Sequence, residues 1–342
     1  MPAIDVTSLQ NTAIQYQKEL LWLPLIGLED SLKYLNLVPN IQNERKITTF
    51  ERTNGILKPH TGAVNKQEDV GKTVTRTLKV YPGDVVVEDF PENYRTVAYG
   101  PDVLLGKNQS KKHPWELVML RAIMESVSED LNLSLFCGQR NDAILDAYHV
   151  FDGFDRIIDL EIDEGTISPA IGNLFPYSYT LGNGNPMEYL LGMWKAAPLE
   201  LRRKKTIMYV SQAMFDEYNN YFLYEMGAMM DIFNHTIDKK DYTLLAGTEG
   251  RCTLAPMIGK QGTNRVLLTD YSNMEVGVDQ TSDQEFIEVR RVDNPFVVQF
   301  VVKLVFGVQV QSLHKKRFVV DMGGGAEIPA GSGSGSGSGS VI

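Results

Sequence analysis

The sequence predicts an α+β protein with an elongated body, because it contains a rod-like helix, an unusually long strand and a hairpin with little apolar content. The helix is expected over residues 113–136, where Pro114 suits the first helical position and Gly138 follows as a terminator. Apolar residues recur on one face of this helix: Leu120, Met124, Val127, Leu131 and Leu135. At about 1.5 Å per residue, the helix would be roughly 35 Å long.

The long strand is expected directly after Asn294-Pro295. Every second residue there is apolar, in the row Phe296, Val298, Phe300, Val302, Leu304, Phe306, Val308 and Val310. At about 3.3 Å per residue this strand would be roughly 50 Å long, several times the common length. A strand and a helix of these lengths imply an elongated body.

The hairpin is expected within residues 46–100. Residues 47–57 alternate loosely between polar and apolar, and residues 73–80 alternate regularly. A polar tip containing Pro59 and Gly62 lies between these two stretches. Since a lone two-stranded hairpin is marginally stable in water, we expect this one to rest on another surface.

The N-terminal residues 1–45 carry more apolar surface than a chain terminus usually exposes. A short amphipathic helix is expected to run through Leu20 and to end at Pro24. The apolar stretch that includes Trp22 and Leu25 needs a partner, which is either the core of the same subunit or a neighbouring subunit.

The middle of the chain predicts a mixed layer of short strands and helices. Residues 157–163 alternate aliphatic and acidic side chains and are expected to form a strand. Asn185 precedes a helix, and the apolar strand 206–210 is followed by Ser211, which is expected to cap the next helix. Two more strands are expected around a turn at residues 270–273.

The composition of the 342 residues is that of a soluble, folded protein with a net charge of −10. A dedicated nucleic-acid reader usually carries a basic surface instead. The chain has neither a signal peptide nor an apolar stretch of about 20 residues, so we expect a protein that folds in the cytoplasm and has no membrane partner. Cys137 and Cys252 are expected to be inert thiols, and the Gly/Ser-rich end, residues 321–342, a flexible tail.

Motifs for catalysis or cofactor binding are missing from the sequence. The five histidines form no pair at metal-ligand spacing, and there is no nucleophile elbow, phosphate-binding loop or dinucleotide fingerprint. The sequence therefore predicts no catalytic residues, no cofactor and no enzymatic function.

Two charged runs allow a functional interpretation beside a structural one. On a strand, Asp159, Glu161 and Asp163 would share one face and could hold a hard cation, although a solvated strand face is the favoured interpretation. The basic run from His314 to Arg317 is a candidate for contact with phosphate, against a solvated turn as the alternative.

The order of these parts resembles that of the major capsid proteins of tailed bacteriophages, whose fold is shared with encapsulin shells. Three stretches carry the resemblance: Leu135-Phe136-Cys137-Gly138 with Phe151-Asp152-Gly153-Phe154, then Ile207-Met208-Tyr209-Val210-Ser211 with Phe215 and Tyr218, then Leu267-Leu268-Thr269-Asp270 with Asn273-Met274 and Val276-Gly277-Val278-Asp279. The resemblance implies a phage major capsid fold with an N-terminal arm, an extended β-hairpin loop, a peripheral domain with a long spine helix and long β-strands, and a mixed α/β axial domain. The implied division is 1–45 arm, 46–100 extended loop, 101–149 peripheral domain with spine helix 113–136, 150–285 axial domain, 286–320 return to the peripheral domain and 321–342 tail.

By this resemblance, the chain would assemble as pentamers and hexamers into an icosahedral virion shell around double-stranded DNA, in the cytoplasm of a host bacterium. Implied partners are further copies of the chain, a separate scaffolding protein, the portal and other virion proteins, and DNA contacted without sequence preference. The residues expected at contacts between subunits are Leu20, Trp22, Leu25, Lys58, Pro59, His60, Lys66 and Lys72. The alternatives are an encapsulin, which would enclose protein cargo, and an unrelated α/β enzyme.

Overall fold

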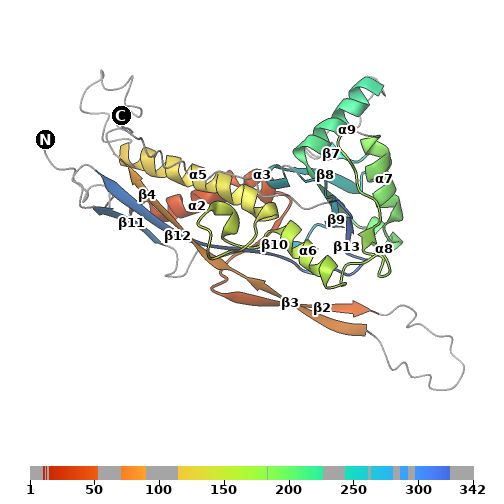
Figure 1. The fold of residues 1–342 in the computed structure, drawn as a ribbon, viewed down its shortest axis with the longest axis horizontal. Helices are drawn as coiled ribbons and strands as arrows, with labels where there is room; N and C mark the ends of the chain where they lie inside the picture. Colours follow the sequence, from red (N-terminus) through yellow and green to blue (C-terminus); the bar gives the residue numbers. More distant parts are fainter. Residues whose placement is uncertain are drawn as a thin grey trace, which may run out of the picture.

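The structure is a computed structural model that describes residues 11, 13, 15–52, 71–89, 115–182, 184–225, 243–260, 263–279, 286–291 and 297–323. The described residues form two sheets with helices packed on them and a two-stranded hairpin that projects from the body (Figure 1). None of the described helices combines the length and the hydropathy that a membrane span requires. The expected Gly/Ser tail and most of the hairpin tip lie outside the described residues.

The five-stranded sheet, which we call the longer sheet because of the length of its strands, is built around the predicted long strand. Its strands are β1 (Asn36–Val38), β4 (Tyr81–Asp89), β10 (Met274–Val278), β11 (Phe286–Arg291) and β12 (Val298–Val310). The order is β1-β10-β12-β11, and β4 pairs with the other edge of β12. The 13 residues of β12 span about 43 Å, and the even-numbered side chains from 298 to 310 are all buried. The expected long strand and its register are thereby confirmed, apart from Phe296, which lies outside the described residues.

Helices cover one face of this sheet. They are α2 (Gln17–Gly27), α3 (Glu29–Leu32), α5 (Trp115–Cys137), the short η2 (Ala147–His149) and α6 (Phe154–Asp163). The expected rod-like helix is confirmed as α5, whose predicted apolar row is buried in one core with the even-numbered side chains of β12. It ends where the Gly138 N–H donates to the Ser134 carbonyl at 3.0 Å.

Two expectations about these helices are wrong. The helix α2 continues through Pro24 to Gly27, because Leu20, Leu25 and Leu28 are buried in the core that α5 also lines. Residues 157–163 belong to a helix rather than a strand. Phe154 and Ile158, one helical turn apart, are fully buried, so helical periodicity decides this segment.

The second sheet has six strands in the order β5-β13-β9-β6-β8-β7. They are β5 (Leu174–Phe175), β6 (Thr206–Ser211), β7 (Thr243–Leu244), β8 (Cys252–Met257), β9 (Leu267–Asp270) and β13 (Phe318–Asp321). One face meets the core around α5, where Tyr209 is buried, and the other meets a second core that contains Met208 and Val210. The sheet is therefore a central layer, buried on both faces.

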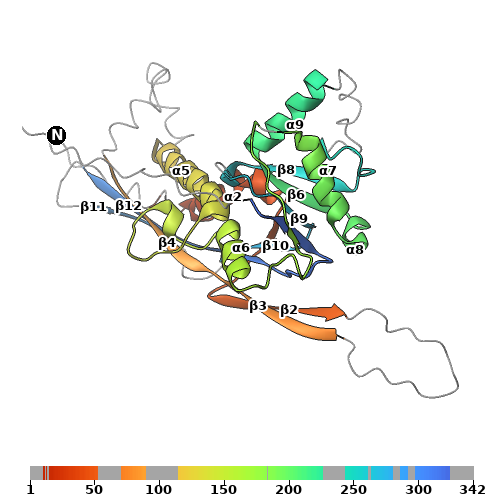
Figure 2. The ribbon, with the colours of Figure 1, turned by 45° about the vertical axis from the view of Figure 1, so that its right-hand side comes forward.

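Helices α7 (Pro186–Ala196), α8 (Leu199–Arg202) and α9 (Gln212–Glu225) line the second core, and the short η3 (Ile258–Lys260) follows β8. Figure 2 shows the three longer helices on the side of this sheet that faces away from α5. The expected helix after Asn185 and the expected cap at Ser211 are confirmed. Asn185 accepts a hydrogen bond from the Glu188 N–H at 3.1 Å, and Ser211 accepts one from the Met214 N–H at 3.3 Å.

The chain crosses between the two sheets at the turn after β9 and at the turn before β13. The strands expected around residues 270–273 exist, but β9 lies in the six-stranded sheet and β10 in the longer one. Asn273 ties the two turns together, because its side chain donates to the Ser312 carbonyl at 2.9 Å and accepts from the Ser312 N–H at 2.8 Å. The two sheets therefore meet at a fixed junction.

Buried charges join α6 to the six-stranded sheet. Lys260 is completely buried, and its ammonium group donates to both carboxylate oxygens of Asp155 at 3.0 and 3.1 Å. Arg265 donates to the Asp155 carbonyl at 3.0 Å and to the Asp159 carboxylate at 2.6 Å. Removing one partner would leave a buried charge unpaired, so these contacts fix the position of α6.

Asp321 makes the stability of the fold depend on pH. Its burial raises the pKa of the carboxyl from 3.8 to about 6, against hydrogen bonds from Tyr189, Val266 and Gly323 that lower it. The pKa of Asp321 is higher in the folded state than in the unfolded state, so its protonated carboxyl contributes its full stabilisation of the fold below about pH 3.8. This contribution is lost as the pH rises through about 6.

Replacing Asp321 by asparagine should remove this pH dependence. A shift of about 2 pKa units corresponds to about 3 kcal/mol. Urea unfolding from pH 4 to pH 7.5 should therefore show wild-type stability falling by about that amount relative to Asp321→Asn. The exposed Asp142→Asn is the control and should follow the wild type. Parallel curves for wild type and Asp321→Asn would contradict the assignment.

Candidate assembly surface

The projecting hairpin consists of β2 (Glu44–Arg52) and β3 (Gly71–Lys79). The strands pair antiparallel from Glu44 opposite Lys79 to Arg52 opposite Gly71. Figure 1 shows them extending from the body beyond the junction of the two sheets. Near the end of the described part of the hairpin, the side chain of Phe50 is 56% exposed, whereas that of the adjacent Glu51 is only 14% exposed, so the two faces of β2 differ there.

The base of the hairpin rests on the longer sheet, on the face opposite to the helices. Ile47 and Leu78 are buried there in a small core with Val305 of β12, and Val38, Ile41 and Val80 complete that core. The expectation that the hairpin rests on another surface is confirmed for its base.

A cross-strand pair of glycines allows the hairpin base to approach the sheet closely. Gly277 of β10 lies opposite Gly307 of β12. A Cβ atom on Gly307 would lie 2.0 Å from the Lys79 carbonyl oxygen, and one on Gly277 would lie 3.0 Å from Ile41 and from Val80. At Gly307 only glycine permits this contact, whereas at Gly277 a Cβ atom would require the neighbouring side chains to shift by a few tenths of an ångström.

Gly307→Ala should therefore destabilise the protein by about 1–3 kcal/mol, since backbone atoms of the hairpin would have to move. Gly192→Ala in α7 is the matched control, because a Cβ atom there meets nothing within 4 Å. That substitution should stabilise the helix by about 0.5–1 kcal/mol. Thermal unfolding of the two variants measures both effects, and equal melting temperatures would show that the close approach is wrong.

Arg76 of β3 makes several polar contacts between the hairpin and the body. Its guanidinium group donates to the Val310 carbonyl at 2.8 Å, to the Gln309 side chain at 2.9 Å and to Glu161 of α6 at 2.6 Å. The side chains of Arg76 and Glu161 are only 11% and 16% exposed, so this ion pair is largely shielded from water. It sets the direction in which the hairpin leaves the body.

Arg76→Ala should lower the free energy of unfolding by about 2–4 kcal/mol, because Glu161 is left without its partner. Lys72→Ala, on the same strand, removes an ion pair to Glu51 whose lysine is 76% exposed and should cost less than about 0.5 kcal/mol. Chemical denaturation compares the two. Hydrogen exchange should also become faster at the hairpin base in Arg76→Ala alone.

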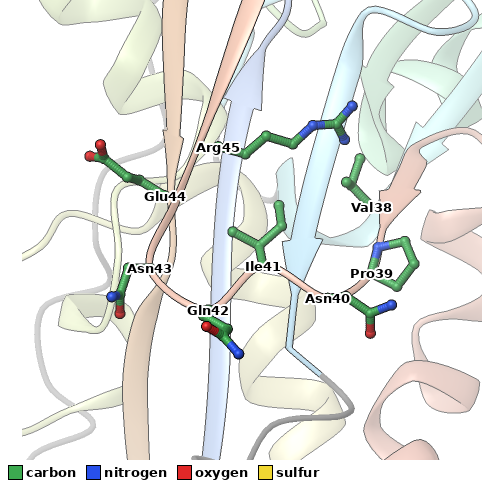
Figure 3. Close-up of a pocket in the computed structure, with 8 residues that line it drawn as sticks. All are labelled: Val38, Pro39, Asn40, Ile41, Gln42, Asn43, Glu44 and Arg45. Carbon is green, nitrogen blue, oxygen red and sulfur yellow. The ribbon is translucent and has the colours of Figure 1, made fainter.

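The loop that leads into the hairpin, residues 38–45, lines an open hollow beside the base (Figure 3). The side chain of Arg45 extends over the neighbouring strands. Burial raises the pKa of the Glu275 carboxyl on β10, and the charge of Arg45 lowers that pKa by a smaller amount. The hollow is part of the support of the hairpin and contains no group that we assign to catalysis.

The predicted contact residues fall into three groups. Leu20 and Leu25 are buried in the subunit's own core, which favours the first of the two partners considered for the N-terminal arm. Lys72 lies exposed on β3. The side chain of Trp22 and the tip residues lie outside the described residues: Lys58, Pro59, His60 and Lys66.

The candidate metal site is wrong. Because residues 154–163 are helical, the three carboxylates do not share one face. Asp159 pairs with Arg265, Glu161 pairs with Arg76, and Asp163 is exposed. Throughout the described ranges, no three histidine, cysteine, aspartate or glutamate side chains come together as a metal site.

Arg76 and the glycine pair were not among the residues predicted from the sequence. The signals for them are an arginine between two threonines of an alternating strand, and glycines inside two strands that are otherwise rich in β-branched and aromatic residues.

No protein-family model and no curated protein matches the sequence. Solved structures do match. A chain of the procapsid of satellite phage P4, in a structure that includes the size determination protein Sid, has a TM-score of 0.57 at 13% identity, over 94% of this chain and 91% of that one. A chain of the holo-SrpI encapsulin complex from Synechococcus elongatus has a TM-score of 0.51 at 9% identity, over 85% of each chain. The chain therefore has the fold that phage capsid proteins share with encapsulins.

Proposed function

We propose that the chain is the major capsid protein of a tailed bacteriophage. It is a structural subunit rather than an enzyme, and it assembles as pentamers and hexamers into an icosahedral shell that encloses double-stranded DNA. The observation that carries the proposal is a hairpin that is fixed at its base and exposes the apolar side chain of Phe50 near its far end, in a chain with the fold of phage capsid proteins and encapsulins.

The hairpin is suited to contact a neighbouring subunit. Its far end exposes Phe50 and Lys72, and its direction is fixed by Arg76 and the glycine pair. A surface that is held in place before association loses little conformational entropy on binding. The tip residues Lys58, Pro59, His60 and Lys66 would extend this contact.

The proposal includes partners that the single chain does not contain. A shell of this kind needs a portal and other virion proteins, and we propose a separate scaffolding protein as a further partner. Assembly would take place in the cytoplasm of the host bacterium. The net charge of −10 suits a container that must not hold its DNA tightly.

An encapsulin is the second candidate, because the chain also resembles the SrpI encapsulin chain over 85% of its length. The contents of the particles distinguish the two. A phage shell formed with its packaging partners should protect DNA from added nuclease, whereas an encapsulin should copurify with a protein cargo.

Sedimentation velocity of the full chain, with negative-stain microscopy of the fractions, tests assembly. We expect rings or closed particles far larger than the 38.3 kDa subunit. A single monomer species at micromolar concentration, unchanged across salt concentrations and scaffolding conditions, would contradict the proposal.

A further inference from the structure

We propose that the junction between the two sheets carries a binding site for the phosphate backbone of double-stranded DNA. The site, called the junction patch, consists of Arg203, Lys204, Lys205, Lys315, Lys316 and Arg317. The inference deepens the proposed function, because it names the residues through which a DNA-enclosing subunit would touch its contents.

Two basic runs that are far apart in the sequence meet in this patch. Lys204 and Arg317 both bind the Asp270 carboxylate, at 3.2 Å for the lysine and at 2.9 and 3.1 Å for the arginine. Lys316 lies 3.6 Å from Glu200 of α8, whose pKa is lowered by a backbone hydrogen bond and, to a smaller extent, by the charges of Lys316 and Arg203. These two carboxylates hold the cations together without neutralising them all.

The turn that carries the second run is held firmly in place. Asn273 bonds to Ser312 in both directions, and the Thr269 hydroxyl donates to the Arg317 carbonyl at 2.8 Å. A rigid turn presents its cations in a constant arrangement, so binding costs little ordering.

Lys205 and Lys315 adjoin the paired Lys204 and Lys316 in the sequence, and we infer that they are the cations left for a ligand. Both side chains are exposed, and neither forms an ion pair within the described part of the chain. Such residues contribute to DNA affinity by releasing counterions from phosphates, which makes binding weaken steeply with salt.

DNA fits this patch better than a second copy of the chain does. Four of its six cations are lysines, a residue that is depleted in protein–protein interfaces and that serves well as a point charge for phosphate. The patch is also a local exception in a chain with a net charge of −10, so its cations are concentrated where the chain folds back between its sheets.

The test measures binding of a fluorescent 30-base-pair duplex by the full-length chain, between 50 and 200 mM salt. Lys205→Ala/Lys315→Ala should weaken binding about tenfold and lower the slope of log affinity against log salt by about two. Lys46→Ala/Lys79→Ala, two exposed lysines of the hairpin, is the control with the same change of charge. Screening over about 10 Å should leave that control close to the wild type.

Three outcomes would overturn the proposal: no binding by the wild type, equal losses in both double variants, or unchanged DNA binding with altered assembly in the patch variant. The last outcome would make the patch a contact between copies of the chain. Microscopy of the same samples separates this result from the proposed function. The patch variant should still form particles, and a wild type that binds DNA through the patch without forming particles would leave the patch standing and remove the capsid function.

Discussion

Phe300→Asp should abolish folding of the subunit. Phe300 lies in the middle of β12, is fully buried, and stands between Val87 of β4 and Val289 of β11. An unpaired carboxylate at this position costs several kcal/mol, and a small protein is stable by only about 5–15 kcal/mol in total. Soluble expression and far-ultraviolet circular dichroism report the loss.

Gln299→Asp is the matched control on the adjacent position. The Gln299 side chain points to the other face, where it donates to Glu88 at 2.9 Å, and Arg290 is its partner on β11. The new carboxylate would lie opposite Glu88 and lose that hydrogen bond, but it would remain solvated beside Arg290, so the variant should fold and lose about 1 kcal/mol. Equal tolerance of the two substitutions would mean that the register of β12 is wrong.

Removal of the hairpin tip should abolish shell formation without unfolding the subunit. Arg52 pairs with Gly71, so residues 53–70 can be replaced by Asn-Gly, which forms a two-residue turn in this register. The buried base around Ile47 and Leu78 is untouched. The melting temperature should therefore stay within a few degrees of the wild type, while particles disappear or change in size.

Phe50→Ser provides a graded version of this experiment. It removes an exposed apolar side chain from the far end of the hairpin and leaves the chain length unchanged. We expect normal thermal unfolding and a higher concentration threshold for assembly.

If particles of normal size form without the tip, the hairpin is not an assembly element. If the subunit itself unfolds, the hairpin belongs to the core.

The sequence predicts the elements whose own periodicity is long enough to decide their structure. The apolar rows lie in α5, which has 23 residues, and in β12, which has 13, and both rows place the buried face correctly. Residues 157–163 are too short for such a decision, because the aliphatic and acidic alternation that suggests a strand also leaves Ile158 and Ile162 one helical turn apart. Phe154, just upstream, extends the apolar face of the helix.

Contacts between distant segments could not be predicted in this way. Glu161 binds Arg76, which is 85 positions earlier in the chain. Asp270 forms ion pairs with Lys204 and with Arg317, which belong to two basic runs that are far apart in the sequence. Each of these residues is compatible with an exposed charged surface when its own neighbourhood in the sequence is considered. The sequence alone likewise left open which partner covers Leu20 and Leu25, and the packing of α2 in the core of α5 decides it.

A cryo-electron microscopy map of the assembled particles tests directly whether the chain forms a capsid shell through its hairpin. We expect closed shells built of pentamers and hexamers, in which β2 and β3 of each subunit lie across a neighbouring subunit while Arg76 keeps its contact with Glu161. Particles in which the hairpin touches only its own subunit, or a chain that never forms closed particles, would contradict it.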